Sequence, residues 1–257
     1  MNNLAQAIGV ELLKARRSRI PLFTALGFSL LPFVGGFFMI VLKDPELARR
    51  AGLIGAKARI AMGVADWPTY LSFLTLAIAA AGTVLFSLIG SWVFGREYSD
   101  HTVKDLLALP TARSSIVFAK FVVIVVWSLA LVAMIYLIAL GVGAAVALPH
   151  IPVPSLLRGG VHLATTAALT LAVITPIIFF ASAGRGYLPP MGVAILAIAL
   201  AQIVGVAGWG EYFPWMIPAL YAQGETLGAI SYLLVIVTSI VGLAGTFAWW
   251  EFADQAH

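Results

Sequence analysis

The sequence predicts an all-α integral membrane protein that crosses the bilayer six times and forms one transmembrane domain over residues 1–257. Hydrophobic residues make up 61% of the chain and charged residues only 10%. A soluble domain carries about 45–50% apolar and about 25% charged residues. Mean hydropathy is +1.02. Several apolar runs reach the roughly 20 residues that a helix needs to cross a bilayer. Most of the apolar surface is therefore expected to face lipid.

Six apolar runs are separated by segments that contain charges, glycines or prolines. The predicted spans are about 21–42, 68–94, 117–148, 159–183, 187–209 and 227–250. Pro176 lies inside the fourth span and predicts a kink there, because proline lacks the backbone N–H of a regular helix. Between the fifth and sixth spans, Pro214 and Pro218 exclude one straight helix. Two short helices that dip into the outer leaflet, or a plain belt of aromatic residues at headgroup depth, fit this segment.

The segment before the first span, residues 1–20, has helical periodicity. Leu4, Ile8 and Leu12 fall on one helical face. Four bases follow them: Lys14, Arg16, Arg17 and Arg19. This pattern predicts an amphipathic N-terminal helix on the inner leaflet. The alternative is an ordinary positive flank that only orients the first span.

The distribution of bases predicts that both termini are cytoplasmic. With the N-terminus inside, the inner segments carry nine of the 15 lysines and arginines, and the outer segments carry six. The excess agrees with the preference of positive charge for the inner side. An even number of spans returns the C-terminus to that side, so we expect a multi-pass protein of the plasma membrane that contacts membrane lipids.

The polar stretch FGREYSDHTVKDLLALPTARSSIVFAK, residues 94–120, stands between the second and third spans. Thr102 and Asp105 form a T-x-x-D pattern, close to a capping box at a helix start, and Pro110 ends the helix. A short cytoplasmic helix with an apolar stripe and mixed charges suits docking of a protein partner. A solvated connection between two spans is the alternative.

No catalytic, cofactor or metal site is expected in this chain. The four histidines are far apart, cysteine is absent, and no phosphate-binding loop occurs. Lys120 lies near an inner end of the third span and is expected to snorkel towards water. His162 lies near an outer end and is expected to be interfacial or hydrogen-bonded. No dense basic patch with interleaved aromatics indicates nucleic-acid binding.

Residues 94–120 resemble the coupling-helix region of type-2 ABC exporter permeases, the family that includes bacitracin, lantibiotic and sodium-export permeases. That family shows a G-x-E-x-x-x-x-T-x-x-x-L-x-x-P pattern between spans two and three. The matching positions here are Gly95, Glu97, Thr102, Leu106 or Leu107, and Pro110. The six spans, the N-terminal helix and the aromatic segment EYFPWMIPALYA are also similar to the family.

The resemblance implies a permease that forms the translocation pathway of an ATP-driven exporter as a dimer with a second copy or a paralogue. It also implies two cytoplasmic ATPase subunits, which hold ATP and Mg²⁺ and dock under the coupling helix. Glu97 is the foremost docking candidate, because it sits where the helix leaves the membrane and can pair with a partner's base. The full set of expected coupling contacts is Arg96, Glu97, Tyr98, Asp100, His101, Thr102 and Asp105. The alternative function is a non-transporting membrane anchor or sensor that recruits a cytoplasmic partner.

Overall fold

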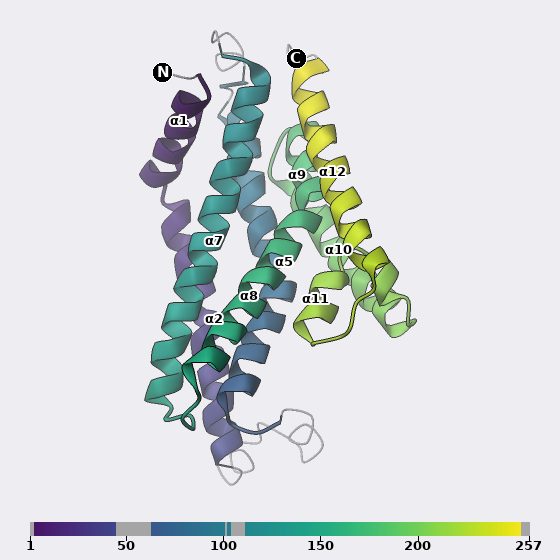
Figure 1. Cartoon of the computed structure of the whole chain (residues 1–257). Helices are drawn as coiled ribbons and strands as arrows, with labels where there is room; N and C mark the ends of the chain where they lie inside the picture. The colour runs from purple at the N-terminus through teal and green to yellow at the C-terminus, as the bar shows by residue number, and fades with distance from the viewer. Residues whose placement is uncertain (1–2, 45–62, 101, 104–110, 253–257) are drawn as a thin grey trace.

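The computed structural model describes residues 3–44, 63–100, 102–103 and 111–252, which form a bundle of helices (Figure 1). Within these ranges, six helices are long and apolar enough to cross a membrane, and no strand occurs. They are α2 (Ile20–Lys43), α5 (Trp67–Ser99), α7 (Arg113–Ala145), α8 (Val153–Val173) continued by α9 (Thr175–Ala183), α10 (Leu188–Val206) and α12 (Ala229–Phe252). The shorter helices are α1 (Asn3–Arg17), η1 (Gly210–Tyr212) and α11 (Ile217–Ala222). The prediction of an all-α membrane protein with six spans is confirmed.

The helix of the second span continues beyond the predicted membrane-crossing residues, as the placement of Glu97 on the helix where it leaves the membrane implies. α5 continues past residue 94 to Ser99, and α7 begins at Arg113, before the predicted start at 117. At its other end, the side chain of Asp66 accepts a hydrogen bond from the N–H of Thr69 at 2.9 Å and caps the helix. Because α5 is extended, the polar residues after position 94 stand on a helix. The predicted coupling helix over 102–110 lies largely outside the described residues.

The fourth span is broken where the sequence predicts a kink. α8 ends at Val173 and α9 begins at Thr175, with Pro176 in the first turn of α9. Proline cannot donate to the carbonyl four residues earlier, which belongs to Ala172. The hydroxyl of Thr175 lies 2.9 Å from that carbonyl and 3.1 Å from the carbonyl of Ser239 in α12. The prediction of a kink at Pro176 is confirmed, and the kink brings α9 against α12.

The segment between α10 and α12 contains two short helices, as its prolines predict. η1 and α11 follow α10, and α11 packs against α8 and α5. Figure 1 shows α11 lying above the lower ends of α2 and α7, so it does not extend the bundle at that end. His162 of α8 stacks on Tyr221 with the ring centroids 4.6 Å apart, and its Nε2 lies 3.4 Å from the carbonyl of Ala222. The expectation of a hydrogen-bonded histidine is confirmed.

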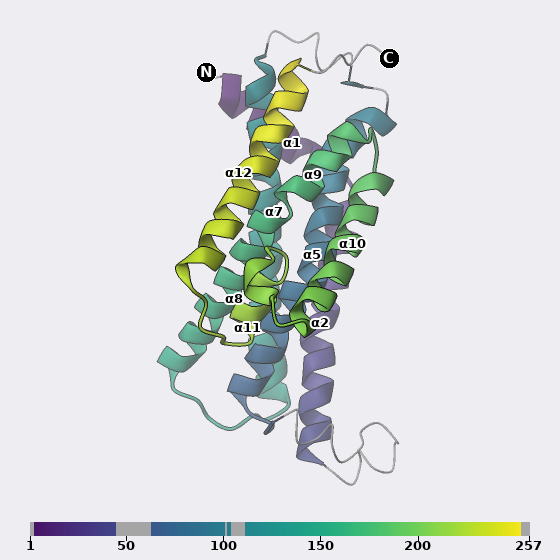
Figure 2. The same cartoon turned by 90° about the vertical axis from the view of Figure 1, so that its right-hand side faces the viewer.

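α5 is the central helix of the bundle. It packs against α2, α7, α8, α9 and α10, and it is more deeply buried than α10 or α12. Figure 2 shows α12 and α10 on opposite sides of this centre. Apolar residues such as Leu233 and Ile240 of α12 remain exposed. Such surface suits lipid or another membrane protein rather than water.

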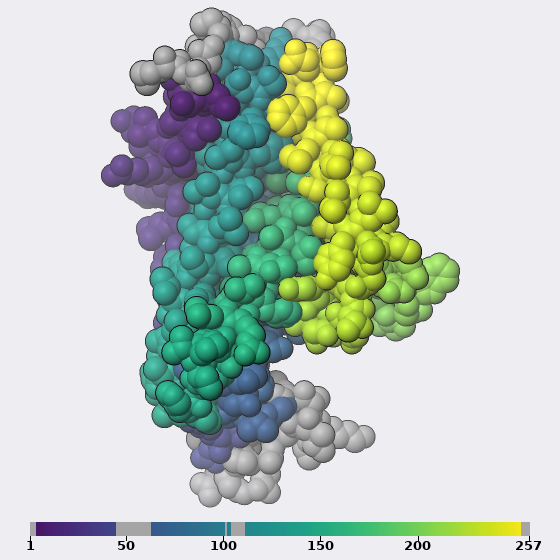
Figure 3. Space-filling model, in the orientation of Figure 1, coloured from purple at the N-terminus to yellow at the C-terminus, as the bar shows by residue number. Residues whose placement is uncertain are grey.

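One end of the bundle gathers the two ends of the chain. The start of α1, the end of α12, the end of α5 and the start of α7 lie together at the top of Figure 1. We call this the termini end. α1 packs against α7 and projects beside it at the upper left of Figure 3. Any force applied to the connection between α5 and α7 acts at this end.

Candidate functional site: a buried charge cluster at the end of α5

The residues predicted to couple this chain to a partner surround the last turn of α5. Arg96, Glu97 and Tyr98 belong to the helix, and Asp100 caps its end by donating its N–H to the carbonyl of Arg96 at 2.8 Å. The N–H of Thr102 donates to the carbonyl of Glu97 at 3.0 Å. The other two predicted residues, His101 and Asp105, lie outside the described residues.

The glycine that begins the family-like pattern has a packing role. A Cβ at Gly95 would lie 3.1 Å from the carbonyl carbon of Gly186 and 3.1 Å from the ring of Tyr187. These residues belong to the turn between α9 and α10, which approaches the end of α5. A larger residue at this position would therefore push the turn away from the last turn of α5.

Arg96 and Asp100 are the members of the set that face outward. Their side chains are 30% and 53% exposed, and Arg96 Nε lies 3.3 Å from Asp100 Oδ2. The guanidinium of Arg96 also lies over the ring of Trp92, 5.2 Å from its centroid. An exposed pair of this kind adds only about 0.3–0.5 kcal/mol to helix stability. Both residues can therefore exchange this pair for a contact with another molecule at small cost.

Glu97 faces the interior instead. The residue is only 3% exposed. Its Oε1 lies 2.8 Å from Lys14 Nζ and 3.0 Å from Lys120 Nζ. Its Oε2 accepts a hydrogen bond from the hydroxyl of Thr102 at 2.8 Å. Both carboxylate oxygens are thus occupied by groups of this chain, which gives Glu97 an internal position where the sequence suggested a direct contact with a partner's base.

Lys120, in the first turns of α7, is the deepest charge of the site. It is fully buried, and its Nζ donates to Glu97, to the carbonyl of Val93 at 2.8 Å and to Glu11 Oε2 at 3.3 Å. The prediction that Lys120 snorkels to water is wrong. Snorkelling spares a charge the cost of burial, but here Glu97 and Glu11 supply opposite charge inside the protein.

The N-terminal helix completes the site. Glu11 of α1 is 6% exposed, and its Oε1 lies 2.8 Å from Lys14 Nζ. Burial lowers the pKa of Lys14, but the neighbouring carboxylates of Glu11 and Glu97 more than offset this and raise its pKa above the ordinary value. Lys14 is therefore charged at neutral pH. We call the four residues Glu11, Lys14, Glu97 and Lys120 the charge cluster.

The charge cluster has two acids and two bases and joins three helices. A buried charge without a partner costs several kcal/mol, and breaking a buried pair typically costs about 3–5 kcal/mol. Moving α1, α5 or α7 away from the other two would separate opposite charges in a poorly hydrated region. The cluster therefore favours movement of these three helix ends as one unit.

The end of α12 is tied to the same region. The ring of Trp250 lies 6.1 Å from Phe94 and 6.4 Å from Tyr98, and its Nε1 donates to Ser182 at 2.9 Å. The guanidinium of Arg113 donates to the carbonyls of Trp250 and Glu251 at 3.2 and 3.1 Å. A base at the C-terminus of a helix also complements the helix dipole. The termini end is thus a connected structure of five helices, α1, α5, α7, α9 and α12.

Sequence reasoning selected Glu97 but missed three of its neighbours in the cluster. Glu11, Lys14 and Lys120 lie 86, 83 and 23 positions from Glu97 in the sequence. One signal was available, since Lys120 stands at the start of the third span at the same depth as Glu97 at the end of the second. The spacing of Glu11 and Lys14 also places both on one face of α1.

The chemistry of the site is ion pairing and hydrogen bonding. In the part of the chain that the structure describes, no group of three or more histidines or acids could hold a metal ion. The arrangement can hold helices in register and transmit displacement between them. That property suits a membrane subunit that responds to a force applied at the termini end.

Comparison with known proteins identifies the class. The family model of "ABC-2 family transporter protein" matches residues 7–201. The chain is also similar to the bacitracin transport permease protein of Bacillus licheniformis, with 26% identity over 177 residues, which is 67% of this chain and 85% of that protein. The fold and the comparisons together define a multi-pass membrane permease of an ABC transporter, a transport subunit rather than a catalytic one. The chain belongs to the ABC-2 transporter family.

Proposed function

We propose that this chain is the permease of an ATP-driven exporter, that two copies or paralogues form the translocation pathway, and that two separate cytoplasmic ATPases drive it. The charge cluster is the observation that carries the proposal. It joins the end of α5 to the first turns of α7, the two helix ends between which the family resemblance expects the ATPases to dock. ATP and Mg²⁺ bind in the ATPase chains, and the termini end faces the cytoplasm of the plasma membrane.

The coupling step follows from the contacts of Glu97. An ATPase that pushes on the connection after Ser99 displaces the end of α5 first. Because Oε1 of Glu97 lies within 3.0 Å of both Lys14 and Lys120, α1 and α7 are carried along. The displacement reaches α2 through α1 and the rest of the bundle through α7. In this proposal Arg96 and Asp100 contact the ATPase, and Glu97 positions the helices behind them.

The first experiment asks whether an ATPase accompanies the chain. We expect a P-loop ATPase to co-purify with the tagged chain from its native membrane in mild detergent, and to be lost when Asp100 is changed to Arg. The matched control is Glu225→Arg, because Glu225 is also exposed but belongs to the segment before α12, away from the termini end. Intact chain in good yield without any ATPase would contradict the proposal and favour a membrane anchor or sensor.

The second experiment tests the positioning role of Glu97. Glu97→Gln keeps the size of the side chain and its capacity to bond with Thr102, but removes the charge that the two lysines share. We expect the ATPase to remain bound while the stimulation of its ATP hydrolysis by the permease falls at least about tenfold. A tenfold fall corresponds to a loss of about 1.4 kcal/mol in the coupling free energy. Unchanged stimulation in a variant of normal yield would remove Glu97 from the coupling step.

A further inference from the structure

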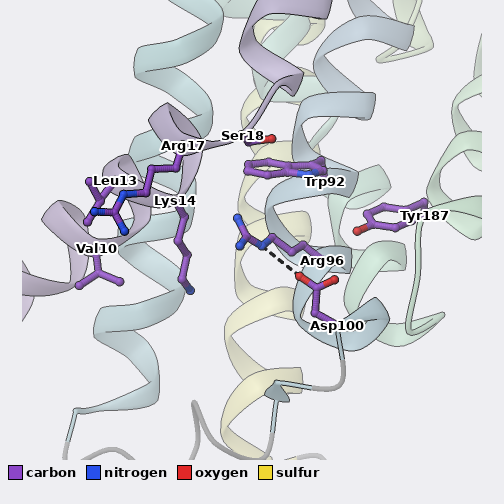
Figure 4. Close-up of a pocket in the computed structure, with 9 residues that line it drawn as sticks. All are labelled: Val10, Leu13, Lys14, Arg17, Ser18, Trp92, Arg96, Asp100 and Tyr187. Carbon is purple, nitrogen blue, oxygen red and sulfur yellow. Dashed lines mark hydrogen bonds and ion pairs between the residues drawn. The ribbon is translucent and has the colours of Figure 1, made fainter.

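A pocket of about 420 Å³ opens between α1 and α5, next to the charge cluster. Figure 4 shows Arg96 extending from α5 towards α1, while the side chain of Arg17 on α1 is turned towards Val10 and Leu13 and Lys14 lies between the two helices. All three bases line the same pocket. Trp92 contributes an aromatic wall, and Val10 and Leu13 contribute an apolar one. Two helices that are distant in sequence thus present bases to one space.

The pocket has more positive than negative charge. Lys14 is matched by Glu11 and Glu97, and Asp100 contacts Arg96 only through Nε at 3.3 Å. Within the described ranges, Arg17 has no hydrogen-bonding or ion-pair partner. Arginine presents planar donors that match the oxygens of a phosphate group in two-point contacts. The lining is therefore suited to a phosphate-bearing anion.

The surface around the pocket distinguishes a lipid from a free anion. Leu88, Trp92 and Arg96 are spaced four residues apart and so share one face of α5. The first of the three is apolar, the second aromatic and the third basic. Tryptophan prefers the depth of the lipid headgroups, so this order follows the change from acyl chain to headgroup. On α1, Val10 and Leu13 are 51% and 46% exposed. A ligand that covers these positions has an apolar portion adjoining its phosphate.

We propose that this pocket binds the phosphate of an anionic phospholipid from the leaflet at the termini end, with Arg17 and Arg96 holding the headgroup from two helices. The acyl chains lie over Leu88 and the exposed apolar face of α1. Basic pockets between membrane helices are known to hold anionic headgroups. The site bridges α1 and α5 on the outside, as the charge cluster bridges them on the inside. It does not depend on the partnership with an ATPase.

Native mass spectrometry of the purified full chain in neutral detergent tests the site. The chain is offered equal amounts of phosphatidylglycerol and phosphatidylcholine, and the bound lipids are counted. We expect a preference for phosphatidylglycerol that falls about thirtyfold in the Arg17→Gln/Arg96→Gln variant, the equivalent of about 1 kcal/mol for each arginine. The matched control, Arg16→Gln/Arg19→Gln, removes the same charge from exposed positions outside the lining and should keep the preference.

The other outcomes each decide the proposal. Absence of a preference in the wild type, or an equal loss in the two double variants, would overturn it. Displacement of phosphatidylglycerol by millimolar inorganic phosphate would show that the pocket takes phosphate without needing a lipid. Loss of ATPase co-purification in Arg17→Gln/Arg96→Gln with the lipid preference intact would assign the pocket to an acidic protein surface. If the double variant does not fold, the preference for phosphatidylglycerol is measured in Arg17→Glu and in Arg16→Glu, which change exposed residues. Only Arg17→Glu should then lose the preference.

Discussion

The two ends of the helix bundle are held by different kinds of contact. At the termini end, Glu97 and Lys120 are buried with opposite charges at 3.0 Å. At the opposite end, the hydroxyl of Tyr136 donates to the carbonyl of Leu156 at 2.9 Å, and His162 stacks on Tyr221. Neutral hydrogen bonds contribute about 0.5–1.5 kcal/mol each, whereas loss of one member of a buried ion pair costs about 3–5 kcal/mol. Stability should therefore be more sensitive to substitution at the termini end.

The largest expected effect is that of Lys120→Met. Methionine fills a similar volume but leaves Glu11 and Glu97 with Lys14 as their remaining base. We expect a loss of about 3–5 kcal/mol, measured as a lower unfolding temperature of the purified protein in mild detergent. The matched control is Lys43→Met at the opposite end, where the lysine is exposed and donates to the carbonyls of Val146 and Ala147. Equal losses in the two variants would refute the difference between the ends.

The comparison is sharpened by a double variant. Glu97→Gln together with Lys120→Met removes one acid and one base, so the number of charges is again balanced. We expect this variant to be more stable than Lys120→Met alone, with an interaction energy of about 1–3 kcal/mol from the four members of the mutant cycle. Additive losses would mean that the two side chains stabilise the bundle independently, despite the short distance between them.

A smaller effect is expected where α12 meets α9. Ser182→Ala removes the acceptor of the buried Trp250 Nε1–H, which has a bond of 2.9 Å in the native chain. An unsatisfied buried donor costs about 1–3 kcal/mol. The loss of stability of this variant should therefore be smaller than that of the cluster variants and larger than that of the variants at the opposite end. The unfolding temperature again reports it. Ser182→Thr, which keeps a hydroxyl, serves as the control for loss of the acceptor.

The smallest effect is expected for His162→Phe. Phenylalanine keeps a ring that can stack on Tyr221 and loses only the 3.4 Å contact between Nε2 and the carbonyl of Ala222. The unfolding temperature should change by the equivalent of about 0.5 kcal/mol or less, because that contact is long for a hydrogen bond. A loss as large as that of Lys120→Met would show that the opposite end depends on His162 more than its geometry indicates.

Much of the fold follows from properties that are local in the sequence. Apolar runs of sufficient length predict the six spans, because a helix pairs its backbone N–H and C=O groups within one segment where no water is available. Pro176 predicts the break between α8 and α9, since its missing N–H acts within one turn. Pro214 and Pro218 likewise predict that the segment between α10 and α12 is divided into η1 and α11. The sequence also places Glu97 where the second helix leaves the membrane, and α5 does continue past residue 94 to Ser99.

The charge cluster could not be derived in the same way. A hydrophobicity pattern says which face of a helix is buried, but not which residues of distant helices meet at the same depth. Glu97 was selected from the sequence through a family pattern, while its internal partners emerged only when α7 was packed against both α5 and α1. The sequence alone determined the number of membrane helices and the position of their breaks. The tertiary structure decided that Glu97 faces inward and Arg96 outward, because the pairing of buried charges depends on distances between helices.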